Sequence, residues 1–554
     1  MAMAAAGAPA HDEHRLVACV VCCMHGSDEE MAALAALRDC VHSHRRLASA
    51  GSLDAAAQAV RHRPLSACTG VALEVLAAAA TTELWVGNRT AAGGQFLRCG
   101  ALDACVGVLD PEAGAEASVV ISALRLCSEL LAGYAPALRV FAAVGGITAL
   151  AAQLKRAADG GAWRGARDSV ASCVKALLSS SRHRSLPMPS LAGELCGMGL
   201  VEPLLVLAEA DEPCCVHATR ALWWVVMAGH DETVLAAGGL SRMLGVLGAL
   251  PRRRNFDEAM GLIVHVSRRD SEALAAIGEG GVAALLTGLT ASALETTVLA
   301  AAETLESAFE AAPRNAATFV KHGGVLIALD QIAMFRTGMR DCVRHVRMLH
   351  TLLKATPSAA PVVARCGGVG VCVKLTSDAA VFTRACGYDV LAELVKDRAC
   401  WEALVKGGGM RAVVEGLGAA VVPGFAGGKD DARRIRCAAA SMLGEALRSQ
   451  PDAAEAVIAS GVAAALCRTL SAASAGGHAP DELLRDACAS ALLALLQQDP
   501  SAAAAVRAAG GVEALLPMAT HDYEADAASA LAFLAVGDRD TAVRAVAAGA
   551  VAAL

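Results

Sequence analysis

The 554-residue sequence predicts an all-α protein in which helical repeats stack into a solenoid. Three observations support this fold class. The chain is 55% hydrophobic but only 3% aromatic, and its apolar residues are mainly alanine, leucine and valine, of which alanine and leucine are strong helix formers. The chain also exceeds the roughly 250–300 residues at which a single hydrophobic core stops growing. Finally, a glycine followed by an aliphatic residue and an apolar segment recurs along the chain, as expected of a repeat array.

The recurring glycine predicts where each repeat turns. Glycine commonly ends a helix because it adopts the left-handed conformation without a Cβ penalty, and a short turn can then redirect the next helix. The first apolar residues after the glycine are spaced by 39 to 54 residues, close to the period of about 40–47 residues known for helical arrays. These twelve junction residues are Leu53, Leu102, Ile147, Val201, Leu240, Val282, Val325, Val369, Met410, Val462, Val512 and Val551.

Each junction is expected to open an apolar helix, followed by a polar loop, a longer amphipathic helix and a short helix that leads to the next glycine. Prolines at Asp499-Pro500-Ser501 and Ala355–Ser358 mark the change from the long helix to the short one, because proline suits a helix start. Longer loops are expected around Ser179–Ser190, Val421–Asp431 and Ser471–Asp481. The sequence thus divides into an N-terminal tail with capping helices, 1–45, and a solenoid, 46–554.

This layout resembles the armadillo repeat, whose unit has a short first helix, a Gly-Ala or Gly-Gly turn, a second helix and a long third helix. The resemblance covers roughly residues 45–554 and implies a right-handed α-solenoid superhelix of about eleven to twelve three-helix repeats. HEAT repeats are the alternative, but they lack the recurrent Gly-Gly turn.

In armadillo proteins such as importin-α, third helices line a concave groove in which Trp and, four residues later, Asn clamp an extended peptide. Here the matching position holds Trp only at Trp223, with Met227 four residues later. None of the asparagines of the chain lies in the middle of an expected third helix. The resemblance therefore does not extend to that peptide clamp, and a groove must recognise side chains or a folded surface.

Two neighbouring third helices are expected to carry opposite charge. Glutamates share one face of the helix around 293–311, and basic residues share one face of the helix around 339–355. Glu303 and Arg347 occupy equivalent positions in the two repeats, as do Glu310 and Lys354. Two interpretations stay open: a ladder of inter-repeat salt bridges worth about 0–1 kcal/mol each, or a split acidic and basic groove that selects a partner of mixed charge. The predicted protein-binding residues are Trp223, Glu303, Glu306, Glu310, Arg340, Arg344, Arg347 and Lys354.

The sequence lacks recognisable catalytic motifs, so no enzymatic activity, cofactor or metal is predicted. Gly427-Gly428-Lys429-Asp430 lacks the first glycine and the Ser/Thr of a phosphate-binding loop. Met31–Leu37 is expected to be an amphipathic helix that starts at a Ser27 capping box. A capping helix pair is therefore favoured over a zinc site. The alternative zinc ligands lie on either side of Met31–Leu37 and are Cys19, Cys22, Cys23, His25, Cys40, His42 and His44.

Charge and cysteine usage favour proteins as partners and the cytoplasm as location. A net charge of −7 gives no general attraction to nucleic acid. The longest uncharged runs, Val140–Leu154 and Gly280–Leu294, are too short for a transmembrane helix of about 20 residues. Scattered cysteines fit a reducing compartment, with the nucleus as a second location. Two functions are considered: an adaptor that docks partners along the groove, or a structural component, axonemal or tethering, of a larger stable assembly.

Two further expectations concern regulation and association. Arg182–Pro187 reads R-x-x-S-x-P, so Ser185 is a candidate phosphosite for basophilic kinases, with an unmodified loop as the alternative. Leu554 falls inside the expected second helix of a twelfth repeat. Part of the apolar surface of Asp526–Val536, including Phe533, is therefore expected to stay uncovered and to dock a partner or a second copy.

Overall fold

The structure is a computed structural model. It describes residues 32, 34–36, 53, 56–60, 67–86, 89–180, 188–210, 212–249, 256–267, 271–291, 295–337, 342–378, 380–419, 428–475, 482–519 and 525–547. All regular elements in these ranges are helices, with no strand among them, which confirms the predicted all-α class. The chain divides into two compact units, Met1–Asp270 and Ser271–Leu554.

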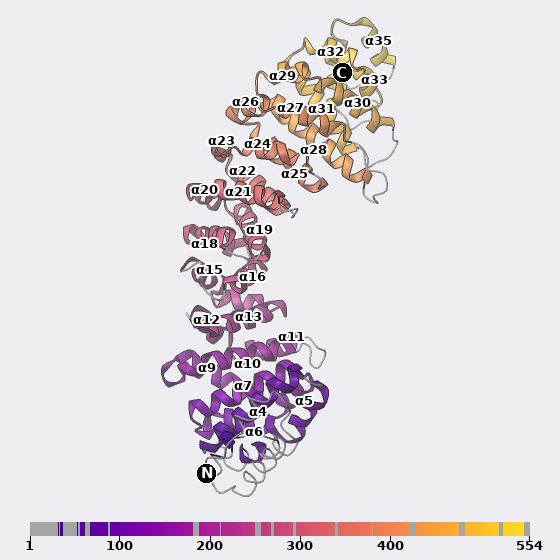
Figure 1. Cartoon of the computed structure of the whole chain (residues 1–554). Coiled ribbons are helices and arrows are strands. Elements are labelled where there is room, and N and C mark those ends of the chain that lie inside the picture. The colour runs from indigo at the N-terminus through magenta and orange to yellow at the C-terminus, as the bar shows by residue number, and fades with distance from the viewer. Residues whose placement is uncertain are drawn as a thin grey trace, which may run out of the picture. The chain divides into compact units, whose positions relative to one another are not determined.

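In unit 1, helices of the same kind pack on one another in chain order. The long third helices form one layer, α4 on α7, α7 on α10, α10 on α13 and α13 on α16, and the second helices α6, α9, α12 and α15 form another (Figure 1). The third helices are α4 (Ala67–Val86), α7 (Ala117–Gly133), α10 (Arg167–Ser180), α13 (Cys214–Met227) and α16 (Phe256–Ser267). The second helices are α6 (Ala101–Leu109), α9 (Gly146–Asp159), α12 (Val201–Glu209) and α15 (Gly239–Ala249). The first helices are α5 (Arg89–Arg98), α8 (Pro136–Ala143), α11 (Met188–Gly197) and α14 (Asp231–Ala236), and η1 (Pro111–Ala113) and η2 (Gly161–Ala166) are short 3₁₀ turns.

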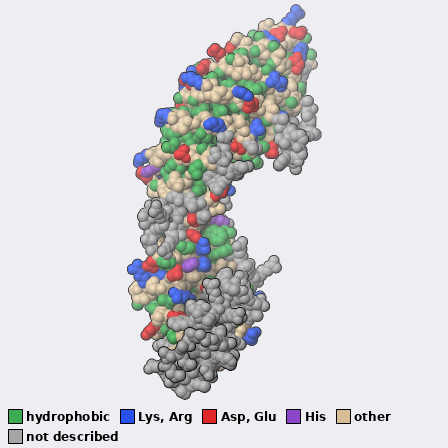
Figure 2. Space-filling view, viewed as in Figure 1, with side chains coloured by type: hydrophobic (Ala, Val, Ile, Leu, Met, Phe, Trp, Pro, Cys, Tyr) green, Lys and Arg blue, Asp and Glu red, His purple; other side chains and the backbone are tan. Residues whose placement is uncertain are grey.

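Unit 2 repeats this layering, and its visible surface intersperses hydrophobic, acidic and basic side chains (Figure 2). Its third helices, each packed on the next, are α19 (Glu295–Ala311), α22 (Val343–Ala355), α25 (Val381–Leu394), α28 (Gly428–Ser449), α31 (Glu482–Gln498) and α34 (Ala525–Ala535). The second helices are α18 (Gly278–Ala291), α21 (Gly324–Thr337), α24 (Gly368–Leu375), α27 (Gly409–Leu417), α30 (Val462–Ala475) and α33 (Gly511–Leu515). The first helices are α17 (Ser271–Ala275), α20 (Pro313–Lys321), α23 (Ala360–Arg365), α26 (Arg398–Lys406), α29 (Ala453–Ala459), α32 (Ala502–Ala508) and α35 (Arg539–Ala547), with η4 (Pro357–Ala359) before α23.

The predicted junctions turn the chain sharply. All junction residues except Val551 lie within the described ranges, and all of these are buried. From Leu102 onward, each lies at or near the start of a second helix. The first and second helices meet at 80° for α8 and α9, 85° for α11 and α12, 91° for α23 and α24, and 76° for α29 and α30. At Gly367, φ is +76°, a left-handed conformation that glycine adopts without strain. The next glycine, Gly368, admits close packing, since an added Cβ would lie 2.3 Å from Cγ1 of Val363.

Two details differ from the sequence expectation. Before Val282 the left-handed turn is at Gly278, with φ +62°, so the Gly280–Gly281 pair lies inside α18. This start places Glu279 near the following repeat, where its carboxylate is 3.0 Å from Lys321 Nζ and 2.8 Å from His322 Nε2. Parts of all three expected loops are helical: 179–180 belongs to α10, 188–190 to α11, 428–431 to α28 and 471–475 to α30. The physical reasons are acidic residues in the first turn of α28 and alanines that extend α30.

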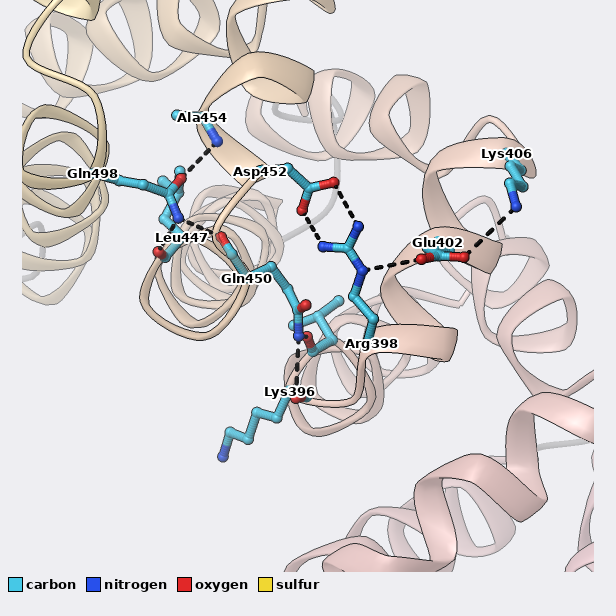
Figure 3. Close-up of polar contacts among 10 residues, drawn as sticks. Lys396, Arg398, Glu402, Lys406, Leu447, Gln450, Asp452, Ala454 and Gln498 are labelled. Carbon is cyan, nitrogen blue, oxygen red and sulfur yellow. Dashed lines mark hydrogen bonds and ion pairs between the residues drawn. The ribbon is translucent and has the colours of Figure 1, made fainter.

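Amide side chains link three successive repeats of unit 2 (Figure 3). Gln450, just after α28, is 3% exposed, and its Nε2 donates to the backbone oxygens of Val395 (2.7 Å) and Lys396 (3.1 Å) after α25. Gln498, at the end of α31, donates to the backbone oxygen of Gln450 and accepts from the backbone N–H of Ala454 at 2.6 Å. Beside them, the Arg398 guanidinium contacts both carboxylate oxygens of Asp452. These bonds satisfy backbone groups that helix ends leave unpaired.

The core also buries a series of thiols. Cys105, Cys127 and Cys173 are fully buried in unit 1, and Cys372 and Cys488 are fully buried in unit 2. Burial raises the pKa of the Cys372 thiol to about 12, since low dielectric surroundings disfavour the thiolate. These cysteines therefore act as small hydrophobic residues, as the sequence suggested.

Within the described part of the chain, no single helix is both long enough and apolar enough to cross a membrane. Four pairs of helices qualify by length and composition only when the two members of each pair are taken together, and each pair is bent by 76° to 91° at its break.

Candidate protein-binding surface on the third helices

The glutamates and arginines predicted on neighbouring third helices lie together on α19 and α22. Arg344 forms an ion pair with Glu303, and Arg347 Nη2 lies 2.8 Å from Glu306 Oε1. Each arginine thus reaches the glutamate one helical turn beyond the position that the repeat register assigned to it. The inter-repeat salt bridges considered from the sequence are therefore present, with a shift of one turn.

The Glu306–Arg347 pair is asymmetric in its exposure to solvent. The Glu306 side chain is 11% exposed and the Arg347 side chain 60%. Burial raises the pKa of the Glu306 carboxyl, and the attraction of Arg347 only partly opposes this effect. The carboxylate therefore depends on its partner, whereas the guanidinium can still reach solvent or another protein.

A groove of about 410 Å³ lies beside these pairs, here named the α19–α22 groove. Glu310 and Lys354 are both exposed, and no ion pair joins either of them to another residue in the described ranges. Burial, followed by the charge of Lys354, lowers the pKa of His350 to about 4, so this imidazole is neutral at pH 7. The lining residues are Glu306, Phe309, Glu310, Pro313, Arg347, His350, Thr351, Lys354 and Ala355.

A second groove, of about 540 Å³, lies on the next third helices and is here named the α25–α31 groove. Phe382 is 52% exposed and Leu483 69% exposed. The guanidinium carbon of Arg434 lies 4.5 Å from the centre of the Phe382 ring, within the range of a cation–π contact. The lining residues are Phe382, Ala385, Asp389, Asp430, Asp431, Arg433, Arg434, Cys437, Ala438, Ser441 and Leu483.

Asp389 is half-buried in the α25–α31 groove. Burial raises the pKa of its carboxyl, and the positive charges of Arg434 and Lys354 oppose this effect. Our sequence analysis did not identify this groove. A signal is present in the sequence, because Phe382 and Asp389 are seven residues apart and so share one helix face.

The remaining predicted residues are found elsewhere. Trp223 lies on α13 in unit 1, where its ring packs edge-on against Trp224 with 4.7 Å between ring centres. Arg340, Ser185 and Val551 lie outside the described residues. So do all the cysteines and histidines weighed as zinc ligands, and the described ranges contain no cluster of three metal-binding side chains.

Comparison with known proteins supports the fold. No protein-family model matches the sequence, and no curated protein is similar to it. A structure solved for the phosphorylation switch that controls the interaction between cadherin and β-catenin is similar over 94% of this chain and 99% of that chain, with TM-score 0.66 and 15% identity. An engineered protein is similar over 78% of this chain and 98% of its own, with TM-score 0.59 and 21% identity. These likenesses show that the chain has a helical-repeat solenoid fold.

Proposed function

We propose that this protein is an armadillo-type scaffold of the cytoplasm that binds other proteins along the third helices of unit 2, and that it is an adaptor rather than an enzyme. The three-helix repeat with its glycine turn supports the armadillo assignment. One similar structure was solved in work on the interaction between cadherin and β-catenin, and β-catenin is an armadillo-repeat protein. A protein-binding role for the fold is consistent with this likeness.

The observation that carries the proposal is the pair of neighbouring grooves. Lys354 lines the α19–α22 groove and also acts electrostatically on Asp389 in the α25–α31 groove, so the two grooves adjoin across α22 and α25. Together they offer an exposed phenylalanine, an exposed leucine and charges of both signs. Aromatic and arginine side chains are enriched at protein interfaces, and mixed charges add specificity.

Proximity labelling in cells that express the chain tests the proposal. A groove variant changes two charges and two apolar side chains that line the grooves. A control variant makes four matched changes at exposed positions on first and second helices. The groove variant is Glu310→Lys, Lys354→Glu, Phe382→Ala and Leu483→Ala, and the control is Arg365→Glu, Glu455→Lys, Leu326→Ala and Val405→Ala.

We expect a set of labelled proteins whose enrichment falls at least tenfold in the groove variant and is unchanged in the control. Exposed substitutions typically change stability by about 0.5 kcal/mol or less, and circular dichroism checks that both variants are folded. Equal labelling by the wild type and the groove variant would contradict the proposal. Recovery of the chain in a fixed-stoichiometry particle that withstands high salt would favour the structural component over the adaptor.

A further inference from the structure

The charges of the α25–α31 groove do not balance one another locally. Arg433 Nη2 lies 3.4 Å from Asp430 Oδ1 on the same helix, and Arg434 lies over the Phe382 ring. Neither arginine forms an ion pair with Asp389 or Asp431, and neither aspartate has such a partner in the described ranges. The groove therefore presents two carboxylates that its own arginines leave without a direct contact.

The carboxylate of Asp389 is the more informative of the two. It lies on α25, the first of the three third helices that line the groove, on one face with the exposed Phe382 ring, and it is half-buried. A carboxylate withdrawn from water gains most from a cation brought to it by a partner, because the interaction is stronger where water is excluded. Phe382 and Leu483 offer apolar walls along which the methylene groups of a lysine or arginine can pack.

We propose that the α25–α31 groove binds a protein segment that carries a lysine or arginine next to a large apolar residue. The cationic group pairs with Asp389, and the apolar side chain packs against Phe382 and Leu483. This inference rests on the proposed function and specifies the chemistry of the partner at one of its two grooves. An acidic segment is disfavoured here, because the three aspartates that line the groove outnumber its two arginines.

Selection of peptides tests this chemistry. A phage-displayed library of random dodecamer peptides is panned against the full chain, and the enriched peptides are synthesised and titrated by fluorescence polarisation. Asp389→Asn is the test variant, since it keeps the shape of the side chain and removes its charge. Glu455→Gln, at an exposed position on first helix α29, is the matched control. Protection of Cys437, which lines the groove, from N-ethylmaleimide locates the bound peptide by mass spectrometry.

We expect enriched peptides that pair a basic residue with Leu, Phe or Met and that protect Cys437. Asp389→Asn should weaken their binding about tenfold and Glu455→Gln should not. Replacing the basic residue of the peptide with glutamine should weaken binding by about the same factor. The two changes together should weaken binding little more than either alone, as expected of one shared contact.

Other outcomes overturn the inference. These are enrichment of acidic peptides, basic peptides that bind Asp389→Asn as tightly as the wild type, and failure to enrich any peptide that protects Cys437. Each of them leaves the proposed function in place, because that function is judged separately by the comparison of labelled proteins in cells.

Discussion

Replacing Gln450 with leucine should weaken unit 2, because it removes an amide that joins the end of α28 to the end of α25 in the preceding repeat. Two hydrogen bonds are lost, to the backbone oxygens of Val395 and Lys396. Val395 is 1% exposed, so its oxygen is left buried without this donor, at a cost of about 1–3 kcal/mol. Lys396 is exposed, and water can replace the bond to its oxygen at little cost. The leucine adds some apolar burial, and the expected net loss is about 1–2 kcal/mol.

Urea denaturation followed by circular dichroism measures this loss. With an m value of about 2 kcal/mol/M, a loss of 2 kcal/mol lowers the midpoint by roughly 1 M. Because repeat arrays can unfold in stages, amide hydrogen exchange should also show faster exchange in α26 and α29. Gln497→Leu is the control, because Gln497 is exposed on the neighbouring helix α31. A variant of Gln450 that is no less stable than this control would refute the reasoning.

Three further predictions follow from charge and exposure. Burial raises the pKa of Glu306 above its unfolded value, so its ionised form is disfavoured in the folded state. The stability that Glu306 contributes therefore falls as the pH rises from its unfolded pKa through its folded pKa. Arg347→Gln should thus destabilise unit 2 more than Glu306→Gln at pH 7, and equal losses in urea denaturation would count against this dependence. Burial lowers the pKa of His345 to about 4, so the unfolded chain takes up a proton first as pH falls. Stability should therefore drop between about pH 6.5 and pH 4, by up to about 3 kcal/mol, and His345→Leu should flatten that drop in thermal scans. Val536, Val543 and Val546 are each more than half exposed, so light scattering should show self-association near about 100 μM that weakens with Val543→Glu, and a monomer at that concentration would exclude it.

The turns were the most predictable part of the fold. A glycine with an aliphatic residue after it identifies a junction from local conformation alone, so the positions from Leu102 to Val512 were correct. The junction at Val282 shows the limit, because three glycines lie within four residues of the sequence there and local preference does not choose among them. With the turn at Gly278, the Glu279 carboxylate contacts Lys321 and His322 in the next repeat.

The surface was less predictable, because it depends on how two helices cross. Equivalent positions in successive repeats suggested that Glu303 faces Arg347, whereas Glu303 pairs with Arg344. A shift of one turn is invisible in repeat spacing and arises from the length and direction of the side chains. The α25–α31 groove was missed for a related reason. Its members come from three separate third helices, and the shared face of Phe382 and Asp389 on α25 does not show that α28 and α31 complete a groove beside it.

The alkylation of the buried thiols can report how often each part of the fold opens. A thiol that is fully buried and whose pKa is raised does not react with an alkylating reagent until the helices around it separate. Cys105 on α6 and Cys173 on α10 lie in neighbouring repeats of unit 1, and Cys372 and Cys488 lie in different repeats of unit 2. Their individual alkylation rates, read by mass spectrometry, would therefore rank the repeats by how often each one opens. No engineered probe would be needed, because the cysteines that fill the core also measure its local opening.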